Sequence, residues 1–288
     1  MKIIDAHLHF FLDEERFRET AKAAGGEATL SYLSAEMKKN QVVLGIGMGT
    51  VPTDPVDENP LELPFESDAW PTAFAQCLGV RATTIHKENR YRTMKRFERE
   101  LARPEVVGFK IYAGYQPYYV NDPVYHPFYE LAEEYDVPVV IHTGDTANSA
   151  GLLKYSHPLT VDEVAVNFPR VQFVMAHYGN PWLVDATEVL VKNPNVYADL
   201  SGLAQGVFNV TEFTKTYRAY LDQFAMWHTY LSRYDKLMYG SDWPLVNMED
   251  YIALLQQMIP QAHQQDVFFA NALRIFKRLQ KHPLLQNP

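Results

Sequence analysis

Two histidines separated by one residue follow the first hydrophobic stretch of the chain. They are His7 and His9, and residues 2–4 before them favour β-structure. On an extended strand, the side chains at positions i and i+2 point to the same face of the sheet. Both imidazoles can therefore reach one metal ion. A pair of hydrogen-bonded or solvent-facing histidines is the alternative that His-x-His alone leaves open.

Later hydrophobic runs end close to further groups that can bind a metal ion or carry a proton. His142 and His177 are the last residues of two such runs, and Asp242 follows a third. Three neutral imidazoles and one carboxylate suit a borderline divalent ion, for which Zn²⁺ is favoured and Mn²⁺ is the alternative. The expected ligands are His7, His9, His142 and Asp242. Bound zinc lowers the pKa of water from 15.7 to about 7. His177 is left for acid–base catalysis or for polarising the substrate's leaving or carbonyl oxygen, and Asp242 can share the transfer of protons.

Eight hydrophobic runs that favour β-structure alternate, for the most part, with segments of helical spacing. The runs are nearly continuous, which is typical of parallel strands covered on both faces. Eight such units predict an α/β fold, a (β/α)8 TIM barrel that forms a single domain over residues 1–288 with extended βα loops. A doubly wound sheet is the alternative, but no glycine-rich phosphate loop follows the first strand. The first strand is expected at the N-terminus and the others at 42–46, 74–80, 106–112, 137–142, 171–177, 196–200 and 237–240; helices are expected at 28–40, 89–103, 125–135, 159–168, 183–192, 210–234, 248–258 and 267–280.

The carboxyl ends of the strands form one rim of such a barrel, and that rim carries the active site. Candidate substrate-binding residues near this rim are Lys110, Arg81, Tyr112 and Trp243. Lys110 has three readings: a carboxylated bridge between two metal ions, an ammonium that binds a substrate carboxylate, or one half of an ion pair. Arg81 suits a carboxylate clamp or a surface ion pair, and the two aromatic residues suit a pocket wall or packing. The segment 50–71, rich in proline and acidic residues, is expected to be a lid or a plain surface loop.

The composition limits the choice of partners. The chain has 288 residues and a net charge of −9, and it contains no run rich in lysine or arginine, so nucleic acid and anionic membranes are poor candidates. Cys77 is the only cysteine, which excludes an intrachain disulfide. The sequence shows no signal peptide pattern and no membrane-spanning apolar run. We expect a cytoplasmic protein with a small-molecule substrate, and a homodimer is the default expectation for its assembly.

Several short motifs resemble those of the amidohydrolase superfamily, and more narrowly of its amidohydrolase-related branch. They are Asp5-Ala6-His7-Leu8-His9-Phe10, His142-Thr143-Gly144, Ala176-His177-Tyr178-Gly179, Tyr239-Gly240-Ser241-Asp242-Trp243-Pro244, and Asn271-Ala272 followed by Phe276. The resemblance implies a metal-dependent barrel enzyme, with the metal at the positions of His7, His9, His142 and Asp242. It also implies a catalytic histidine at the position of His177 and, in this branch, one metal ion rather than two.

The branch contains both hydrolases, such as pyrone-dicarboxylate lactonase, and non-oxidative decarboxylases, such as aminocarboxymuconate-semialdehyde decarboxylase. The leading hypothesis is a hydrolase in which metal-activated water attacks an ester, lactone or amide carbonyl. The alternative is a metal-dependent decarboxylase of a carboxylated unsaturated or aromatic acid. Its substrates need cationic partners, and only Lys110 and Arg81 suggest themselves. A non-catalytic binding protein is the third hypothesis, but the expected metal ligands are all present.

Overall fold

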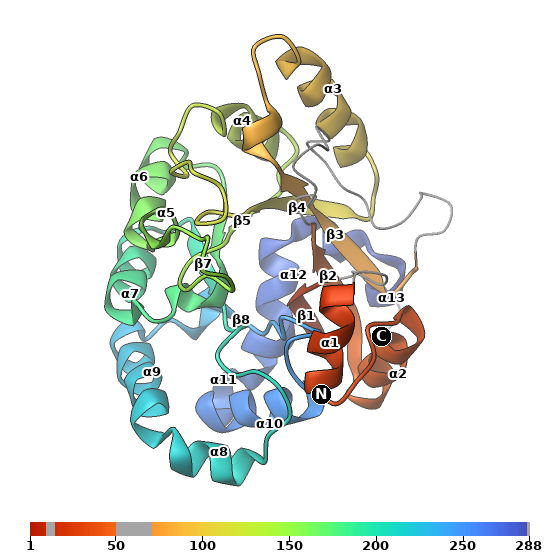
Figure 1. Ribbon diagram of the computed structural model, residues 1–288, viewed down its shortest axis with the longest axis vertical. Coiled ribbons are helices and arrows are strands. Elements are labelled where there is room, and N and C mark those ends of the chain that lie inside the picture. The colour runs from red at the N-terminus through yellow and green to blue at the C-terminus, as the bar shows by residue number, and fades with distance from the viewer. Residues whose placement is uncertain (10–14, 50–70, 287–288) are drawn as a thin grey trace.

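A computed structural model describes residues 1–9, 15–49 and 71–286 of the chain. Eight strands form a single sheet in the order β1 to β8, and every neighbouring pair is parallel. The strands lie at the centre of the molecule and the helices lie around them (Figure 1). The strands are β1 (Ile3–Leu8), β2 (Val42–Met48), β3 (Phe74–Val80), β4 (Val106–Ile111), β5 (Val139–Ile141), β6 (Phe173–Met175), β7 (Val196–Asp199) and β8 (Leu237–Met238).

Helices follow most of the strands along the chain, as right-handed parallel crossovers require. The longer α-helices are α1 (Glu15–Ala23), α2 (Leu30–Lys39), α3 (Arg90–Leu101), α4 (His126–Glu134), α6 (Leu159–Asn167), α7 (Leu183–Lys192), α8 (Val210–Thr216), α9 (Arg218–Leu231) and α10 (Met248–Met258). The shorter helices are η2 (Ala82–Thr84), α5 (Leu153–Ser156), η3 (Ala176–Gly179), η4 (Tyr234–Lys236), α11 (Gln261–Gln265), η5 (Asp266–Ala270), α12 (Asn271–Ile275), η6 (Lys277–Lys281) and α13 (Pro283–Gln286). Among the described residues, no helix has the length and hydrophobicity that crossing a bilayer requires.

Backbone hydrogen bonds join β1 to the chain at and after β8, and they bring the sheet close to a closed barrel. The Ala6 N–H donates to the Tyr239 carbonyl at 2.9 Å, and the Asp242 N–H donates to the His7 carbonyl at 2.7 Å. The His9 N–H donates to the carbonyl of the residue after Asp242 at 2.8 Å. The predicted (β/α)8 TIM barrel is therefore confirmed, and its closure sets the His-x-His segment beside Asp242.

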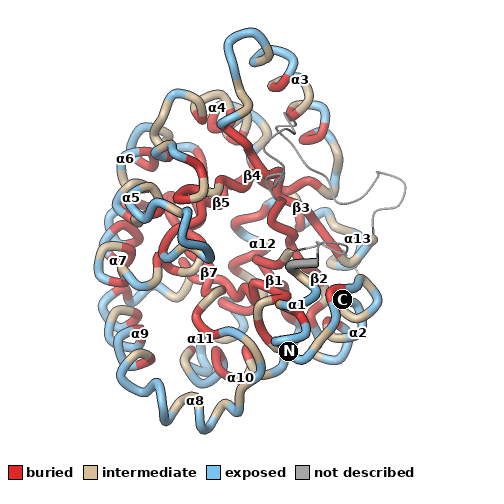
Figure 2. The backbone as a smooth tube through the Cα atoms, in the orientation of Figure 1, coloured by how far each residue is buried: buried red, intermediate tan, exposed pale blue. Residues whose placement is uncertain are grey.

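Side chains of the strands alternate between two hydrophobic clusters, as the two-residue period of a strand requires. In β1, Ile3 contributes to the cluster beneath the surrounding helices, whereas Ile4 and Ala6 contribute to the cluster inside the barrel. The alternation breaks at an irregularity between Asp5 and Leu8, after which Leu8 belongs to the outer cluster. The inner cluster also contains Ile275 and Phe276 from the C-terminal segment. Figure 2 shows the resulting distribution, with the buried backbone concentrated in the strands.

Two expected helices are interrupted in the structure. The helix predicted over 210–234 is divided into α8 and α9, with Tyr217 between them at φ −100° and ψ 22°, outside the helical region. The helix predicted over 267–280 becomes the π-helix η5, then α12 and the 3₁₀-helix η6. Neither interruption contains glycine or proline, so local propensity gives no signal for it. The segment 50–71, expected to be a lid or a plain surface loop, lies almost wholly outside the described residues.

Candidate active site

A cavity of about 560 Å³ opens at the carboxyl ends of the strands. Nearly all of the residues proposed from sequence contribute to its walls: His7, His9, Arg81, Lys110, Tyr112, His142, His177 and Asp242. Tyr115, Thr146, Asn180 and Gln205 add hydroxyl and amide groups. The chain thus places its charged and titratable strand-end residues around one polar cavity, which is the usual position of an active site in this fold.

The structure brings His7, His9 and Asp242 together. One ligand atom of each lies within 4.8 Å of the other two. Nε2 of His9 lies 3.0 Å from Oδ1 of Asp242, and Nε2 of His7 lies 3.5 Å from the same oxygen. The cause is local: the two histidines are two residues apart at the end of β1, and backbone hydrogen bonds hold Asp242 against that strand.

Asp199 is a residue of this centre that the sequence did not single out. It ends β7, is buried, and its Oδ2 lies 2.8 Å from Nδ1 of His7. Together with His7 and His177 it forms a second group of close ligand atoms. A signal existed, because Asp199 is an acidic residue near the end of the hydrophobic run at 196–200.

His142 does not belong to the group of ligand atoms formed by His7, His9 and Asp242. Its Nε2 is 2.9 Å from the backbone carbonyl of Asp145, and its Nδ1 is 3.2 Å from Nε2 of His177. The ring also contacts Tyr115, with a centroid separation of 4.9 Å. The structure therefore places His142 beside the predicted catalytic histidine, on the same side of the cavity.

The hydrophobic run at 171–177 predicts that His177 is the last residue of a strand, but in the structure it is not. Strand β6 ends at Met175, and His177 lies in the short helix η3 with φ 62° and ψ 19°, in the left-handed region. Its backbone N–H donates to Oδ1 of Asp199 at 3.1 Å. Left-handed conformations are uncommon for residues other than glycine and often mark functional sites. Asp242, at φ 59°, shares this feature.

Lys110 is completely buried in β4 and faces the same centre. Its Nζ lies 3.5 Å from Nε2 of His7 and 5.2 Å from the centroid of the Tyr112 ring. Burial lowers the pKa of Lys110 to about 8, against the opposing effect of Asp199 and Asp242. Within the described parts of the chain, no carboxylate lies at ion-pair distance from Nζ, so the structure gives no support to the ion-pair reading of this lysine.

The charges of the centre divide between ionised carboxylates and neutral imidazoles. Burial alone would raise the pKa of Asp242, but the hydrogen bond of His9 and the neighbouring histidines hold that pKa well below its usual range. Asp199 behaves in the same way through its contact with His7. Burial lowers the pKa of His7, and it lowers the pKa of His177 to about 4. At neutral pH the imidazoles of His7 and His177 are therefore lone-pair donors beside two anions.

These contacts also fit a divalent metal ion. The Asp199 carboxylate can only accept a hydrogen bond, so Nδ1 of His7 carries the proton and Nε2 presents its lone pair toward Asp242. The Asp145 carbonyl likewise requires a proton on Nε2 of His142, which leaves a lone pair on Nδ1. A second nitrogen bound to a carboxylate or carbonyl is the usual arrangement of a metal-binding histidine. His7, His9 and Asp242 would hold the ion, with His142 beside them.

The remaining candidates occupy different positions. Arg81 follows β3 directly, is 9% exposed and lines the cavity. Tyr112 also lines the cavity, and its hydroxyl lies 3.5 Å from the Met48 carbonyl. Trp243 is not among the cavity-lining residues; it is buried in the hydrophobic core, and its backbone carbonyl accepts the hydrogen bond of His9. The structure thus places Trp243 behind the site and not in its wall.

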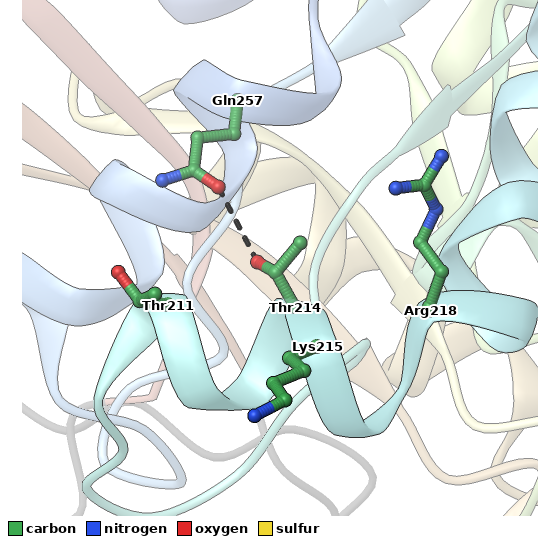
Figure 3. A pocket seen from close by; sticks show the side chains of 5 residues that line it. All are labelled: Thr211, Thr214, Lys215, Arg218 and Gln257. Atoms are coloured by element: carbon green, nitrogen blue, oxygen red, sulfur yellow. Dashed lines mark hydrogen bonds between the residues drawn. The ribbon is translucent and has the colours of Figure 1, made fainter.

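A second hollow, of about 380 Å³, lies on the surface over α8, α9 and α10 and contains no comparable centre (Figure 3). Its lining residues are Thr211, Thr214, Lys215, Arg218 and Gln257. Thr214 donates to Gln257 at 3.3 Å, and the exposed Arg218 pairs with Asp222 at 2.7 Å. Lys215 and Arg218 point away from each other (Figure 3). The described residues that line this hollow include no histidine, aspartate or glutamate, in contrast to those of the barrel cavity.

The fold and the site define a (β/α)8 barrel with a buried histidine–aspartate centre at the carboxyl ends of its strands. The family model described as amidohydrolase matches residues 4–278. The chain belongs to the amidohydrolase family. No curated protein matches the chain.

Solved structures share this fold at low sequence identity. A TIM-barrel protein from Bordetella bronchiseptica is 19% identical, with 96% of this chain and 99% of that chain covered and a TM-score of 0.68. A probable 2-pyrone-4,6-dicarboxylic acid hydrolase from Acinetobacter baumannii, with bound citric acid, is 18% identical (96% and 100% covered, TM-score 0.63). A dihydroxybenzoic acid decarboxylase from a Polaromonas species, with bound manganese and 2-nitroresorcinol, is 14% identical (99% and 99% covered, TM-score 0.63).

Proposed function

We propose that this chain is a metal-dependent hydrolase in which water attacks the ester, lactone or amide carbonyl of a small organic substrate. The observation that carries this proposal is the convergence of His7, His9 and Asp242 at the floor of a polar cavity, with Asp199 fixing the proton on the outer nitrogen of His7. When bound there, one divalent ion, Zn²⁺ or Mn²⁺, would supply Lewis acidity and lower the pKa of a water molecule.

The residues of the chain divide the remaining work. Asp242 and Nε2 of His177 both border the cavity, and either can accept the proton that water loses as its oxygen bonds to the carbonyl carbon. The same group then returns the proton to the leaving oxygen or nitrogen as the bond from the carbonyl carbon breaks. Lys110 and Arg81 are positioned to bind a carboxylate or another anionic group on the substrate.

Decarboxylation of a carboxylated unsaturated or aromatic acid is the second candidate, and Lys110 is the observation that favours it. A buried ammonium beside His7 can hold a carboxylate against the centre. Besides histidine, however, Lys110 and Arg81 are the only cationic side chains among the described cavity-lining residues. That supply suits a substrate with one anionic group better than one with several, and it favours hydrolysis.

The test is a substrate panel read in two ways. Enzyme reconstituted with Zn²⁺ or Mn²⁺ is assayed with aryl esters, γ- and δ-lactones, simple amides and hydroxylated benzoic acids, and both proton release and CO₂ release are recorded. Proton release together with the hydrolysis product supports the proposal, and Asp242→Asn serves as the matched inactive control. Release of CO₂ without a hydrolysis product would replace it with the decarboxylase.

Metal content tests the centre without a substrate. Elemental analysis of protein purified without a histidine tag or chelator should give close to one zinc or manganese per chain. Two ions per chain would indicate a carboxylated Lys110 that bridges them. The absence of metal even after reconstitution would contradict the metal site formed by His7, His9 and Asp242.

A further inference from the structure

The carboxylate of Asp199 connects two of the imidazoles at the mouth of the barrel. Its Oδ2 accepts from Nδ1 of His7 at 2.8 Å. Its Oδ1 accepts from the backbone N–H of His177 and from that of Ser201, both at 3.1 Å, and also from the Ser201 hydroxyl. One residue at the end of β7 therefore fixes the surroundings of both histidines.

The Ser201 hydroxyl lies between Asp199 and the His177 ring. Its Oγ is 2.8 Å from Nδ1 of His177, and the residue is completely buried. A hydroxyl has one proton, and an ionised carboxylate has none to offer. Because Ser201 gives its proton to Asp199, its oxygen can only accept at the His177 side. Nδ1 of His177 must therefore carry the ring proton, which leaves the lone pair on Nε2. This nitrogen lies 3.2 Å from Nδ1 of His142, which also has a lone pair because Nε2 of His142 donates to the Asp145 carbonyl. No proton lies between the two nitrogens, so this point of the cavity attracts a proton or a cation.

The residue after Ser201 fixes the ring from a second direction. Gly202 has φ +71°, and a Cβ atom at this position would lie 2.7 Å from Nδ1 and 3.2 Å from Cγ of His177. The His177 imidazole thus packs against the Gly202 backbone and occupies space that a side chain at position 202 would fill. With the His177 backbone held in the left-handed region by Asp199, the ring is constrained at its backbone, its face and its Nδ1 atom.

We propose that Ser201 is a positioning residue, which works with Asp199 to hold His177 in the Nδ1–H form so that Nε2 can accept a proton from the cavity. The catalytic consequence depends on the hydrolase or decarboxylase function proposed above, whereas the tautomer does not. In trypsin-like proteases a carboxylate orients the catalytic histidine directly; in this chain a serine hydroxyl stands between the two.

The tautomer is measured by long-range ¹H–¹⁵N correlation spectra of zinc-reconstituted protein labelled at histidine, at pH 8. His177 is assigned by comparison with His177→Gln. We expect a protonated-type shift at Nδ1 and an unprotonated-type shift at Nε2. In Ser201→Ala the Nδ1–H preference should be lost. Ser156→Ala is the matched control, because Ser156 is also completely buried and donates to a backbone carbonyl at 2.7 Å, yet its hydroxyl forms no hydrogen bond with a histidine of the described chain.

Kinetics supply the second readout. Ser201→Ala should lower kcat roughly 10- to 100-fold, the usual effect of removing the partner of a functional histidine, with KM unchanged, and Ser201→Cys should recover part of the loss. An Nε2–H tautomer in the wild-type protein would overturn the proposal, even if every variant failed to fold. Retention of the Nδ1–H form in Ser201→Ala would also overturn it. Failure of the whole substrate panel would count against the proposed function and leave the spectra decisive for Ser201.

Discussion

The two ends of the barrel are made by the same eight strands and differ in almost everything else. At the carboxyl ends, His7, Lys110, Asp199 and Asp242 are all at least nine-tenths buried, which desolvates charged and polar groups. At the opposite end, the C-terminal segment closes the barrel with apolar side chains such as Phe276. One end therefore holds the groups that can do chemistry, and the other provides stability without chemistry.

This contrast explains how a stable fold can contain an energetically unfavourable site. At the apolar end, polar side chains of the C-terminal segment form hydrogen bonds with backbone carbonyls at the starts of strands. Asn271 donates to the Leu237 carbonyl of β8 and Arg278 donates to the Val106 carbonyl of β4, both at 2.8 Å. At the chemical end, His177 and Asp242 have left-handed backbones. Strain of about 1–3 kcal/mol per residue persists only where the surroundings over-determine it, and the apolar end supplies part of that excess stability.

The largest expected effect is on activity, from Asp242→Asn. The substitution removes the anionic ligand and a proton acceptor, so kcat/KM should fall at least roughly 10⁴-fold, or about 5 kcal/mol. The fold should remain, because asparagine tolerates a left-handed backbone as aspartate does and the backbone bond to His7 is retained. Steady-state assays on the best panel substrate measure the first point, and circular dichroism measures the second. Near-normal turnover would show that the centre is wrongly assigned.

Phe276→Ala tests the opposite end of the barrel. Phe276 is completely buried in the inner cluster, and truncation of such a side chain should lower the free energy of unfolding by about 4 kcal/mol. Below the unfolding transition, kcat/KM should stay within about twofold, because the side chain lies away from the cavity. Urea denaturation gives the stability. Leu284→Ala, at an exposed hydrophobic residue of α13, is the matched control and should change it little.

The contrast between the two ends also explains what the sequence could predict. Buried parallel strands must be nearly continuous in apolar residues, so the eight strands could be located, and the rule that strand ends meet at one rim brought His7, His9 and Asp242 together. The family motifs covered the same residues. The fold and the three-residue group of ligand atoms were therefore accessible without a structure.

The remaining features depend on contacts between distant segments. Asp199 lies near the end of a hydrophobic run that the sequence shows clearly. Its place in the site follows from its hydrogen bond with His7, which is 192 residues away in the chain. The left-handed turn at His177 is held by a hydrogen bond from a different strand end, and no local propensity encodes it. Trp243 was a candidate for the cavity wall or for packing, and the structure places its side chain in the hydrophobic core.

His228 is a buried imidazole outside the site, and it can be compared with the histidines of the cavity. It lies in α9 among the rings of Tyr178, Phe224 and Tyr234, and neither ring nitrogen has a hydrogen-bond partner among the described residues. Burial lowers the pKa of His228 to about 4. Between pH 6.5 and 4 the unfolded chain therefore binds a proton that the folded chain refuses, so this residue lowers stability as the pH falls through that window.

Replacement by phenylalanine should remove that acid sensitivity. The loss of unfolding free energy between pH 7 and pH 5 should be smaller by about 2 kcal/mol in His228→Phe than in the wild type. Urea denaturation at the two pH values gives the difference, and any packing change common to both values cancels. His86→Phe, at an exposed histidine, is the control. An unchanged pH dependence in His228→Phe would show that this imidazole is already accommodated as a cation.

The smallest effect on stability and activity is expected at the surface hollow over α8, α9 and α10. Cationic side chains line this hollow, but they do not converge with acidic or histidine side chains among its described lining residues. Arg218 and Asp222 form an exposed i,i+4 ion pair, and such pairs contribute little because water and salt screen them. Arg218→Ala should change the free energy of unfolding by less than about 0.5 kcal/mol and leave kcat/KM unchanged. Denaturation at low and high salt together with the substrate assay test this. A loss of activity would mean that the hollow communicates with the barrel mouth, and the functional contrast between buried centre and open surface would have to be redrawn.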